Sequence, residues 1–361
     1  MERRSFLRRA GVGATVGAAV AAPAIVHAQP TVRWRVASSF PKSLDALFGA
    51  AETISRRVNE MSGGKFTISA HAAGEIVPGL QVLDAVQAGT IEMGHTALYY
   101  YFGKEPTWAF ATAVPFGLNC RQYAAWWHAG GGEKLFNEFA GKSGVQAFLA
   151  GNTGAQMGGW FRNEIKSLGD LNGLKFRIAG LAGQVLAKLG VVPQQLAGGD
   201  VYPALEKGTI DATEFTVPYD DEKLGLQKVA KYYYYPGFWE GGAAVHGIVN
   251  QKAYAALPPE YQAMLAAACE EANAYVTARY DAGNPGALKR LIGSGAVLKA
   301  FPKEVLDASY KATQEVYADL SKRSADFKKI HDHYFEFQRD QIAWFRVNEN
   351  TFDDFMASVR R

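Results

Sequence analysis

The stretch LDAVQAGTIE, residues 83–92, has a counterpart in YPALEKGTID, residues 202–211. Each pattern predicts a short helix that ends at a glycine, because glycine readily adopts the left-handed conformation of a helix C-cap, and each then enters a strand at Thr-Ile-acid. The second copy begins 119 residues after the first, which is about the length of a domain. We therefore predict two similar lobes, with chance similarity between two common helix endings as the alternative.

Strands and helices alternate around the first copy. The side-chain pattern predicts strands at residues 32–36, 65–70 and 91–96, and helices at residues 44–61 and 80–88. Ser43 is expected to cap the first of these helices, and the Gly63-Gly64 pair to end it. Because strands and helices follow one another in this order, the fold class is predicted to be α/β.

The second half of the chain is richer in predicted helix. Residues 259–283 are expected to form a long alanine-rich helix, followed by a loop at 283–286 and then by a short helix and a strand up to Pro302. Residues 302–356 are predicted to be almost entirely helical, and they carry many aromatic side chains. These aromatic faces have to pack on something large, which is either the body of the protein or a second copy of the chain.

The composition is that of a globular protein. Of 361 residues, 48% are hydrophobic and only two are cysteines, which excludes both a disordered chain and a disulfide-held scaffold. The net charge of +3 arises in residues 1–28, where four arginines face one glutamate, and the remaining residues carry 34 basic and 34 acidic side chains. A nucleic-acid partner therefore has no electrostatic basis.

Residues 1–28 have the organisation of an export signal. Arg3-Arg4 precedes Ser-Phe-Leu, a run of small apolar residues follows, and Val-His-Ala precedes Gln29. The apolar run is too short and too weakly hydrophobic for a membrane-spanning helix, which needs about 20 residues. We expect a twin-arginine signal peptide, with an ordinary secretory peptide as the alternative, and a mature chain that starts at Gln29 and works in the periplasm.

The sequence contains none of the common catalytic motifs. It has no GxSxG, no Walker loop, no HExxH and no GxGxxG after a strand. The histidines are scattered and are expected to be structural. Cys120 and Cys269 are compatible with one disulfide or with two buried thiols. The protein is therefore not expected to be an enzyme.

Two stretches carry residues suited to binding an anion. GNTGAQMGGW, residues 151–160, places Gln156 near a strand end, where ligand sites gather in α/β folds, although a plain surface turn is the alternative. In LKFRI, residues 174–178, Lys175 and Arg177 share one face of a strand. Arginine can bind a carboxylate through its planar fork, and a solvated basic face is the alternative interpretation.

Two further stretches are acidic. DATEFTVPYDD, residues 211–221, combines carboxylates with turn carbonyls, the ligands of hard cations such as Na⁺ or Ca²⁺. For Asp220 and Asp221 an acidic helix N-terminus is the simpler interpretation. In YYYYPGFWEGG, residues 232–242, Glu240 lies among aromatic residues and glycines, which suits a partly apolar pocket where it would need a cationic partner. The alternative is a crossover strand with Glu240 exposed.

Together with further motifs, these stretches resemble the extracytoplasmic solute receptors of tripartite ATP-independent periplasmic (TRAP) transporters, the DctP/TakP-like family, and in particular its 2-oxo acid-binding branch. The motifs are ASSFPKS (37–43), GEIVPG (74–79), HT (95–96), YYY (99–101), VPQQ (192–195) and GGD (198–200). The resemblance implies a two-lobed type II periplasmic-binding-protein-like fold, with a long inter-lobe helix and a C-terminal helical extension. The implied division is residues 29–150 mainly lobe 1, 151–240 mainly lobe 2, 241–301 the return to lobe 1 with the spanning helix, and 302–361 the C-terminal helices, exchanged between the subunits of a homodimer.

The resemblance also implies roles for individual residues. Arg177 is expected to hold the substrate carboxylate and Gln156 to contact both the substrate and a bound cation. Tyr100 and Tyr101 are expected to line the cleft, with Tyr101 as a further substrate-binding residue. The expected cation ligands are Gln156, Glu214, Glu240 and the backbone carbonyl of Phe215. Close relatives carry tryptophan at position 215. A carbonyl ligand tolerates this change, whereas the different ring alters the shape of the pocket.

The implied function is that of a periplasmic solute-binding protein of a TRAP transporter. It would capture a small 2-oxo monocarboxylate, such as pyruvate or 2-oxobutyrate, with a bound Na⁺ or Ca²⁺, and deliver it to the membrane subunits for sodium-driven uptake. Closure of two lobes over the ligand excludes water and strengthens both the arginine and the cation contacts. The alternatives are a receptor for lactate or another 2-hydroxy acid, a chemosensory binding protein, and a secreted metal-dependent enzyme, which lacks an evident general base or nucleophile.

Overall fold

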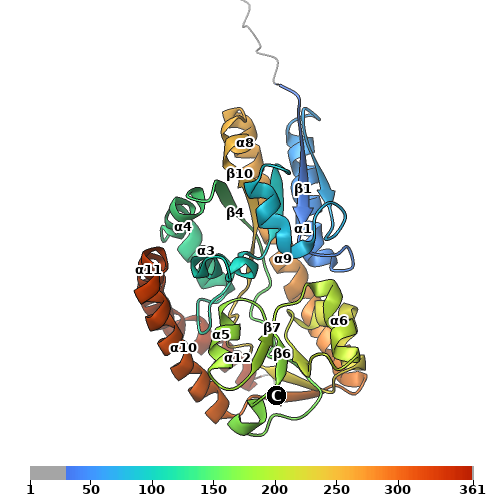
Figure 1. Ribbon diagram of the computed structural model, residues 1–361, viewed down its shortest axis with the longest axis vertical. Coiled ribbons are helices and arrows are strands. Elements are labelled where there is room, and N and C mark those ends of the chain that lie inside the picture. The colour runs from blue at the N-terminus through green and yellow to red at the C-terminus, as the bar shows by residue number, and fades with distance from the viewer. Residues whose placement is uncertain (1–29, 360–361) are drawn as a thin grey trace, which may run out of the picture. The chain divides into compact units, whose positions relative to one another are not determined.

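The computed structural model describes residues 30–359. The predicted signal peptide, residues 1–28, lies outside this range, and so does the predicted start of the mature chain at Gln29. From Val32 onward the chain forms a single unit that is built on two β-sheets (Figure 1). Strands and helices alternate along most of it, so the predicted α/β class is confirmed.

The first sheet has five strands in the order β2-β1-β3-β10-β4. These strands are β1 (Val32–Ser38), β2 (Phe66–His71), β3 (Met93–Thr96), β4 (Val145–Asn152) and β10 (Ala244–Asn250). β1 pairs in parallel with β2 and β3, whereas β10 runs antiparallel to both of its neighbours. Helix α1 (Asp45–Met61) packs against β1 and β2 and buries its apolar face there. We call this sheet together with α1 the first lobe.

The second sheet has six strands in the order β11-β9-β5-β8-β6-β7. They are β5 (Gly159–Phe161), β6 (Lys175–Arg177), β7 (Val192–Gln194), β8 (Ala212–Thr213), β9 (Tyr232–Tyr235) and β11 (Val297–Ala300). We call this sheet together with α6 (Gly198–Glu206) and α7 (Pro218–Leu224) the second lobe. The predicted two-lobed body is therefore present, and each lobe has its own sheet.

The remaining helices connect and cover the two sheets. The α-helices are α2 (Val82–Gln87), α3 (Cys120–His128), α4 (Gly132–Gly141), α5 (Leu181–Ala187), α8 (Gln251–Ala255), α9 (Pro259–Gly293), α10 (Lys303–Arg323), α11 (Ala325–Val347) and α12 (Glu349–Val359). Short 3₁₀ helices are η1 (Gly79–Gln81), η2 (Leu98–Tyr101), η3 (Pro106–Ala111), η4 (Leu168–Leu171) and η5 (Leu226–Lys228). Across residues 30–359, none of the helices combines the length and the apolar character needed to cross a membrane.

The two similar sequence stretches have the same structure. α2 and α6 each end just before a glycine with positive φ, +70° at Gly89 and +72° at Gly208. The next residue then donates its backbone N–H back into the helix, from Thr90 to Ala85 O (2.9 Å) and from Thr209 to Ala204 O (3.0 Å). The acid that closes each stretch accepts a backbone N–H from the neighbouring strand, Arg35 N to Glu92 and Lys175 N to Asp211. The predicted helix, its glycine C-cap and the acid that follows are therefore present in both lobes.

Two local predictions are wrong. Ser43 does not cap α1: the N-cap residue is Leu44, and no side chain caps the helix. Residues 283–286 are expected from the sequence to form a loop but belong to α9, which runs for 35 residues and includes Pro285. Contacts with the second lobe hold the helix there. The Asn284 side chain accepts the backbone N–H of Tyr219 (3.1 Å), and a methyl group at Gly283 would lie 2.6 Å from the Tyr219 ring.

The aromatic C-terminal helices pack mainly on the body of the same chain. α10 contacts α5, and α11 contacts α3 and α4 (Figure 1). The buried Tyr334 of α11 accepts the backbone N–H of Leu118 (2.8 Å). In α12, as far as the structure describes it, no residue is buried, and Phe352 and Phe355 are exposed. Cys120 and Cys269 are not joined to each other.

Candidate functional site

Arg177 lies in the interior of the second lobe. It shares one face of β6 with Lys175, since side chains two apart in a strand point the same way. Lys175 at the start of the strand is exposed, whereas Arg177 at its end is 0% exposed. The solvated basic face is therefore the wrong interpretation for Arg177. Its guanidinium donates from Nε (3.2 Å) and Nη2 (3.1 Å) to the carbonyl oxygen of Leu196, and from Nη1 to the carbonyl oxygen of Glu214 (2.9 Å).

Glu214 directly follows β8 and is placed beside Arg177 by the sheet. β8 pairs in parallel with β6, with Thr213 opposite Arg177. The Glu214 side chain accepts through Oε1 from Arg177 Nη1 (2.6 Å) and from the backbone N–H of Ala179 (3.2 Å). Its second oxygen, Oε2, has no hydrogen-bond partner within residues 30–359. One oxygen is thus fixed to the guanidinium, and the other is an acceptor without a donor.

Gln156 and Glu240 lie on two segments that are joined by backbone hydrogen bonds. Gln156 N donates to Glu240 O (3.0 Å), and Gly237 N donates to Gln156 O (3.0 Å). The Gln156 amide donates from Nε2 to Thr153 Oγ1 (3.2 Å). Among the described residues, Gln156 Oε1 and both carboxylate oxygens of Glu240 have no hydrogen-bond partner with normal geometry. Glu240 is 1% exposed, so the alternative of an exposed Glu240 is wrong.

These groups form a buried and electrostatically unbalanced cluster. Burial raises the pKa of Glu214 to about 7, although Arg177 acts in the opposite direction. Burial and the nearby Glu214 charge raise the pKa of Glu240 well above its usual value, and Arg177 and the Tyr99 hydroxyl only partly oppose this. Although its own burial acts against it, the Glu214 charge raises the pKa of Arg177, which therefore stays charged. One buried guanidinium thus faces two buried carboxyl groups.

The unpartnered atoms of this cluster suit a hard cation. Glu214 Oε2, Gln156 Oε1 and the two Glu240 oxygens are all acceptors, and hard cations take oxygen ligands of these types. Across residues 30–359, no group of three or more His, Cys, Asp or Glu side chains is arranged to hold a metal ion. A cation at this cluster would therefore depend on amide or carbonyl oxygens as well as on the two carboxylates.

The three tyrosines 99–101 have different surroundings. In a 3₁₀ helix such as η2, successive side chains point about 120° apart. The Tyr101 hydroxyl accepts the backbone N–H of Leu83 (3.1 Å) and is hydrogen-bonded to Thr96 Oγ1 (3.1 Å). Tyr99 and Tyr100 are the two that interact with the charges of the buried cluster. A binding role for Tyr101 stays a prediction, and Tyr99 was missed because the YYY run does not reveal which ring faces inward.

Phe215 completes the surroundings of Arg177. Its ring is 3% exposed, and its centroid lies 5.3 Å from the guanidinium carbon. The structure therefore brings together five of the six predicted site residues, namely Gln156, Arg177, Glu214, Phe215 and Glu240.

Asp220 and Asp221 occupy the first turn of α7 as predicted, but both are buried. Asp220 Oδ2 accepts from the Tyr280 hydroxyl (2.5 Å), and Asp221 Oδ2 accepts from the Tyr233 hydroxyl (2.7 Å) and Trp160 Nε1 (3.1 Å). Burial raises the pKa of Asp220 to about 7 and that of Asp221 to about 6. Through these hydrogen bonds the two acids attach α7 to α9, which carries Tyr280, and to the second sheet, which carries Trp160 and Tyr233.

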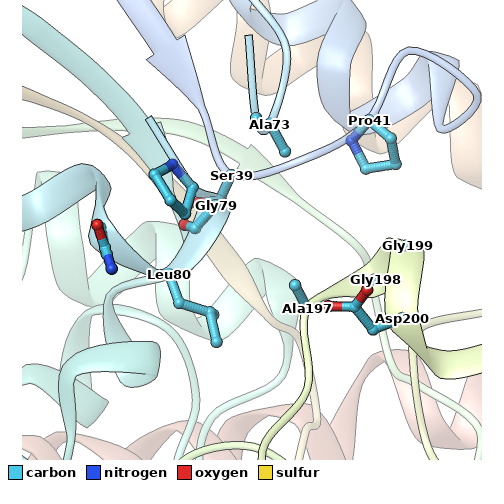
Figure 2. A pocket seen from close by; sticks show the side chains of 12 residues that line it. Ser39, Pro41, Ala73, Gly79, Leu80, Ala197, Gly198, Gly199 and Asp200 are labelled. Atoms are coloured by element: carbon cyan, nitrogen blue, oxygen red, sulfur yellow. The ribbon is translucent and has the colours of Figure 1, made fainter. Parts of the chain in front are cut away.

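A cavity of about 470 Å³ lies between the start of α6 and the loops that follow β1 and β2, and the residues that line it do not include Gln156, Arg177, Glu214 or Glu240. Figure 2 shows one wall formed by Ala197, Gly198, Gly199 and Asp200, at the start of α6, and the facing wall by Ser39, Pro41, Ala73, Gly79 and Leu80 of the first lobe. Leu196, whose carbonyl binds Arg177, directly precedes the α6 wall. The cavity thus reaches the loop that holds the guanidinium.

Comparison with protein families gives one match that covers most of the chain. The model of the bacterial extracellular solute-binding protein family 7, DctP, matches residues 37–324. A curated relative, the monocarboxylate 2-oxoacid-binding periplasmic protein of Nostoc sp., is 47% identical over 363 residues, which cover 99% of this chain and 100% of the relative.

Two solved structures are similar along nearly their whole length. A TRAP transporter solute-binding protein from Bordetella bronchiseptica, a mixed-occupancy dimer with copurified calcium and picolinate bound, is 52% identical with a TM-score of 0.90, covering 92% of this chain and 98% of that one. A TRAP periplasmic solute-binding protein from Pseudoalteromonas atlantica, with bound sodium and pyruvate, is 36% identical with a TM-score of 0.87, covering 90% and 99%.

Proposed function

Because the chain belongs to the family 7 bacterial extracellular solute-binding proteins, we propose that it captures a small 2-oxo monocarboxylate, such as pyruvate or 2-oxobutyrate, together with a cation. As a member of this family it is an extracytoplasmic solute-binding receptor of a TRAP transporter and not an enzyme. The Nostoc relative's name and the pyruvate bound in the Pseudoalteromonas structure support the ligand class.

The observation that carries the proposal is the buried Arg177 beside acceptors that lack donors. A ligand carboxylate would bind the guanidinium in competition with Glu214, since charge-assisted bonds of this kind are strong and directional. Glu214, Glu240, Gln156 and the Phe215 carbonyl would hold the cation. When bound, the cation supplies positive charge that compensates the two buried carboxylates and the ligand oxygens. Each of these interactions is strengthened by the low dielectric of the buried site.

The fit of a 2-oxo acid follows from its two adjacent oxygen groups. Its carboxylate matches the arginine fork, and its carboxylate and oxo oxygens together form a chelating pair for a hard cation. Lactate offers a hydroxyl in place of the oxo group, and dicarboxylates offer a second charge for which the described residues of the cluster provide no second arginine. The missing second arginine thus ranks monocarboxylates above dicarboxylates, and the 2-oxo acids named for the relatives rank 2-oxo acids above lactate.

The test is calorimetry on mature protein treated with a chelator, with pyruvate as titrant and with Ca²⁺, Na⁺ or neither present. Lactate and succinate are titrated in parallel. We expect pyruvate to bind only when one of the cations is present, and this comparison decides between Na⁺ and Ca²⁺. Binding of pyruvate that is equally tight without a cation would contradict the cation site, and preferred binding of lactate or succinate would contradict the ligand class.

A variant pair ties the binding to the site. Arg177→Met should abolish pyruvate binding. Lys175→Met is the matched control, because Lys175 lies two residues away on the same strand but is exposed. Equal loss in both variants would show that the effect is not specific to the buried guanidinium.

We extend the proposal to assembly and export. The exposed apolar side chains of α11 and α12, such as Trp344, Phe352 and Phe355, would be covered in a homodimer, and the Bordetella relative was a dimer. Arg3-Arg4 would direct export by the twin-arginine route. Light scattering of the mature protein tests the first statement, and loss of export on Arg3→Lys/Arg4→Lys substitution tests the second.

A further inference from the structure

The guanidinium of Arg177 is held on three sides. Leu196 O accepts bonds from Nε and Nη2, Glu214 accepts from Nη1, and the Phe215 ring lies against the group at 5.3 Å. A cation beside an aromatic ring is attracted to the face of that ring, most strongly where water is excluded. The ring therefore helps to fix the position of the group that the proposed ligand would bind.

The tip of the same ring lies against Gly198, the first residue of α6. A Cβ atom at position 198 would lie 2.8 Å from Cζ and 2.9 Å from Cε2 of Phe215. Gly198 is not among the glycines with positive φ, so its backbone conformation does not require glycine. Glycine also lacks the helix propensity of alanine. The space taken by the Phe215 ring is thus the physical reason for glycine at this position.

The adjacent Gly199 has different surroundings. A Cβ at Gly199 would meet no atom of the described residues within 4 Å. The two glycines are neighbours in the first turn of α6 and share the same cavity wall (Figure 2). A methyl group therefore fits at position 199 and collides with the Phe215 ring at position 198.

We propose that Gly198 is a positioning residue for anion binding: it leaves the space that keeps the Phe215 ring against the Arg177 guanidinium. The inference rests on the proposed function. An added methyl group at position 198 meets the tip of a side chain and not the backbone, so the ring moves while the fold is retained. A displaced ring no longer packs against the guanidinium, and the guanidinium is then held only by its hydrogen bonds to Leu196 and Glu214.

The test is a double-mutant cycle on the mature protein with pyruvate and Ca²⁺, measured by calorimetry. Gly198→Ala should weaken binding at least tenfold, whereas Gly199→Ala should leave it within twofold of wild type. Phe215→Leu should weaken binding by at least as much as Gly198→Ala does, because it removes the ring that Gly198→Ala only displaces. In the Phe215→Leu background, Gly198→Ala should have no further effect, because the shorter side chain makes room for the methyl group. A tenfold loss that persists in this background, or no loss in Gly198→Ala alone, would overturn the inference.

A second readout needs no ligand and separates this inference from the proposed function. The guanidinium carbon of Arg177 lies 5.3 Å from the centre of the Phe215 ring, so the resonances of the guanidinium protons, such as Nε–H, report the ring current. The resonance should shift in Gly198→Ala and in Phe215→Leu but not in Gly199→Ala. An unchanged resonance in Gly198→Ala would refute the positioning role even if wild type binds pyruvate. A shifted resonance in a protein that binds none of the acids would support the positioning role and reject the proposed ligand.

Discussion

Replacing Arg177 by methionine should destabilise the protein as well as abolish ligand binding. The Arg177 and Glu214 side chains are 1% and 0% exposed and lie 2.6 Å apart. Removing one partner of such a pair leaves an unpaired buried charge, which costs about 3–5 kcal/mol in other proteins. For a protein of this size, a loss of that order lowers the melting temperature by roughly 5–15 °C.

A second variant separates the cost of the orphaned carboxylate from the loss of packing. In Arg177→Met/Glu214→Gln the buried pair becomes neutral, and the glutamine can still accept the backbone N–H of Ala179. Because neutral replacements of buried ion pairs are often tolerated, this double variant should recover about 2 kcal/mol of the loss. Neither variant should bind pyruvate.

The assay is urea unfolding of the protein without ligand, followed by fluorescence, with Lys175→Met as the control for an exposed charge on the same strand. If Arg177→Met unfolded within about 1 kcal/mol of wild type, the guanidinium and the carboxylate would not form a buried pair in solution. If Arg177→Met/Glu214→Gln were less stable than Arg177→Met, the unpaired charge would not be the cause of the loss.

Three further outcomes are expected. Tyr101→Phe should lose about 1 kcal/mol of stability through its two hydrogen bonds, without a change in pyruvate affinity; a tenfold weaker affinity would place Tyr101 in the binding site after all. Burial and the neighbouring Asp221 raise the folded-state pKa of Asp220 to about 7, although the Tyr280 and Thr216 hydroxyls donate hydrogen bonds to it. Between about pH 4 and 7 the folded state therefore holds a proton that the unfolded chain has lost. Stability therefore falls as pH rises through this window, and Asp220→Asn should gain about 2 kcal/mol over wild type between pH 5 and 8, seen in parallel urea titrations; a pH-independent difference would contradict this. Deletion of residues 349–361 removes the exposed α12 and should convert a dimer to a monomer in light scattering without loss of folding; a dimer that persists would show that α12 is not the contact.

The features that could be predicted from sequence are those fixed by local chemistry. The glycine that ends α2 and α6 and the acid that follows it are set within ten residues, and the structure repeats both in detail. The alternation of side chains in β6 placed Lys175 and Arg177 on one face of the strand, but it did not show which of the two is buried. Burial of Arg177 depends on the pairing of β6 with β8 and with the edge strand β7, in a six-stranded sheet that the chain assembles from segments far apart in sequence.

The incorrect predictions have the same origin. Asn284-Pro285 predicts a break in a helix, yet contacts with Tyr219, more than 60 residues away, hold the segment in α9. The three adjacent tyrosines illustrate a similar limit. Composition indicates an aromatic surface, but only the 3₁₀ geometry of η2 decides that Tyr99 and Tyr100 face the buried charges while Tyr101 is turned toward Leu83.

The continuity of α9 constrains how the two lobes can move. Its 35 residues span about 50 Å at 1.5 Å per residue, and it packs on α1 of the first lobe and on α7 of the second. At its contact with α7 the helix has no side chain at Gly283 and no backbone N–H at Pro285. The internal ladder of α9 is thus interrupted at the point where the Tyr219 ring rests on a bare backbone. Bending of α9 at the missing bond would let the second lobe turn relative to the first while α7 stays attached to α9 through Tyr280 and Asn284.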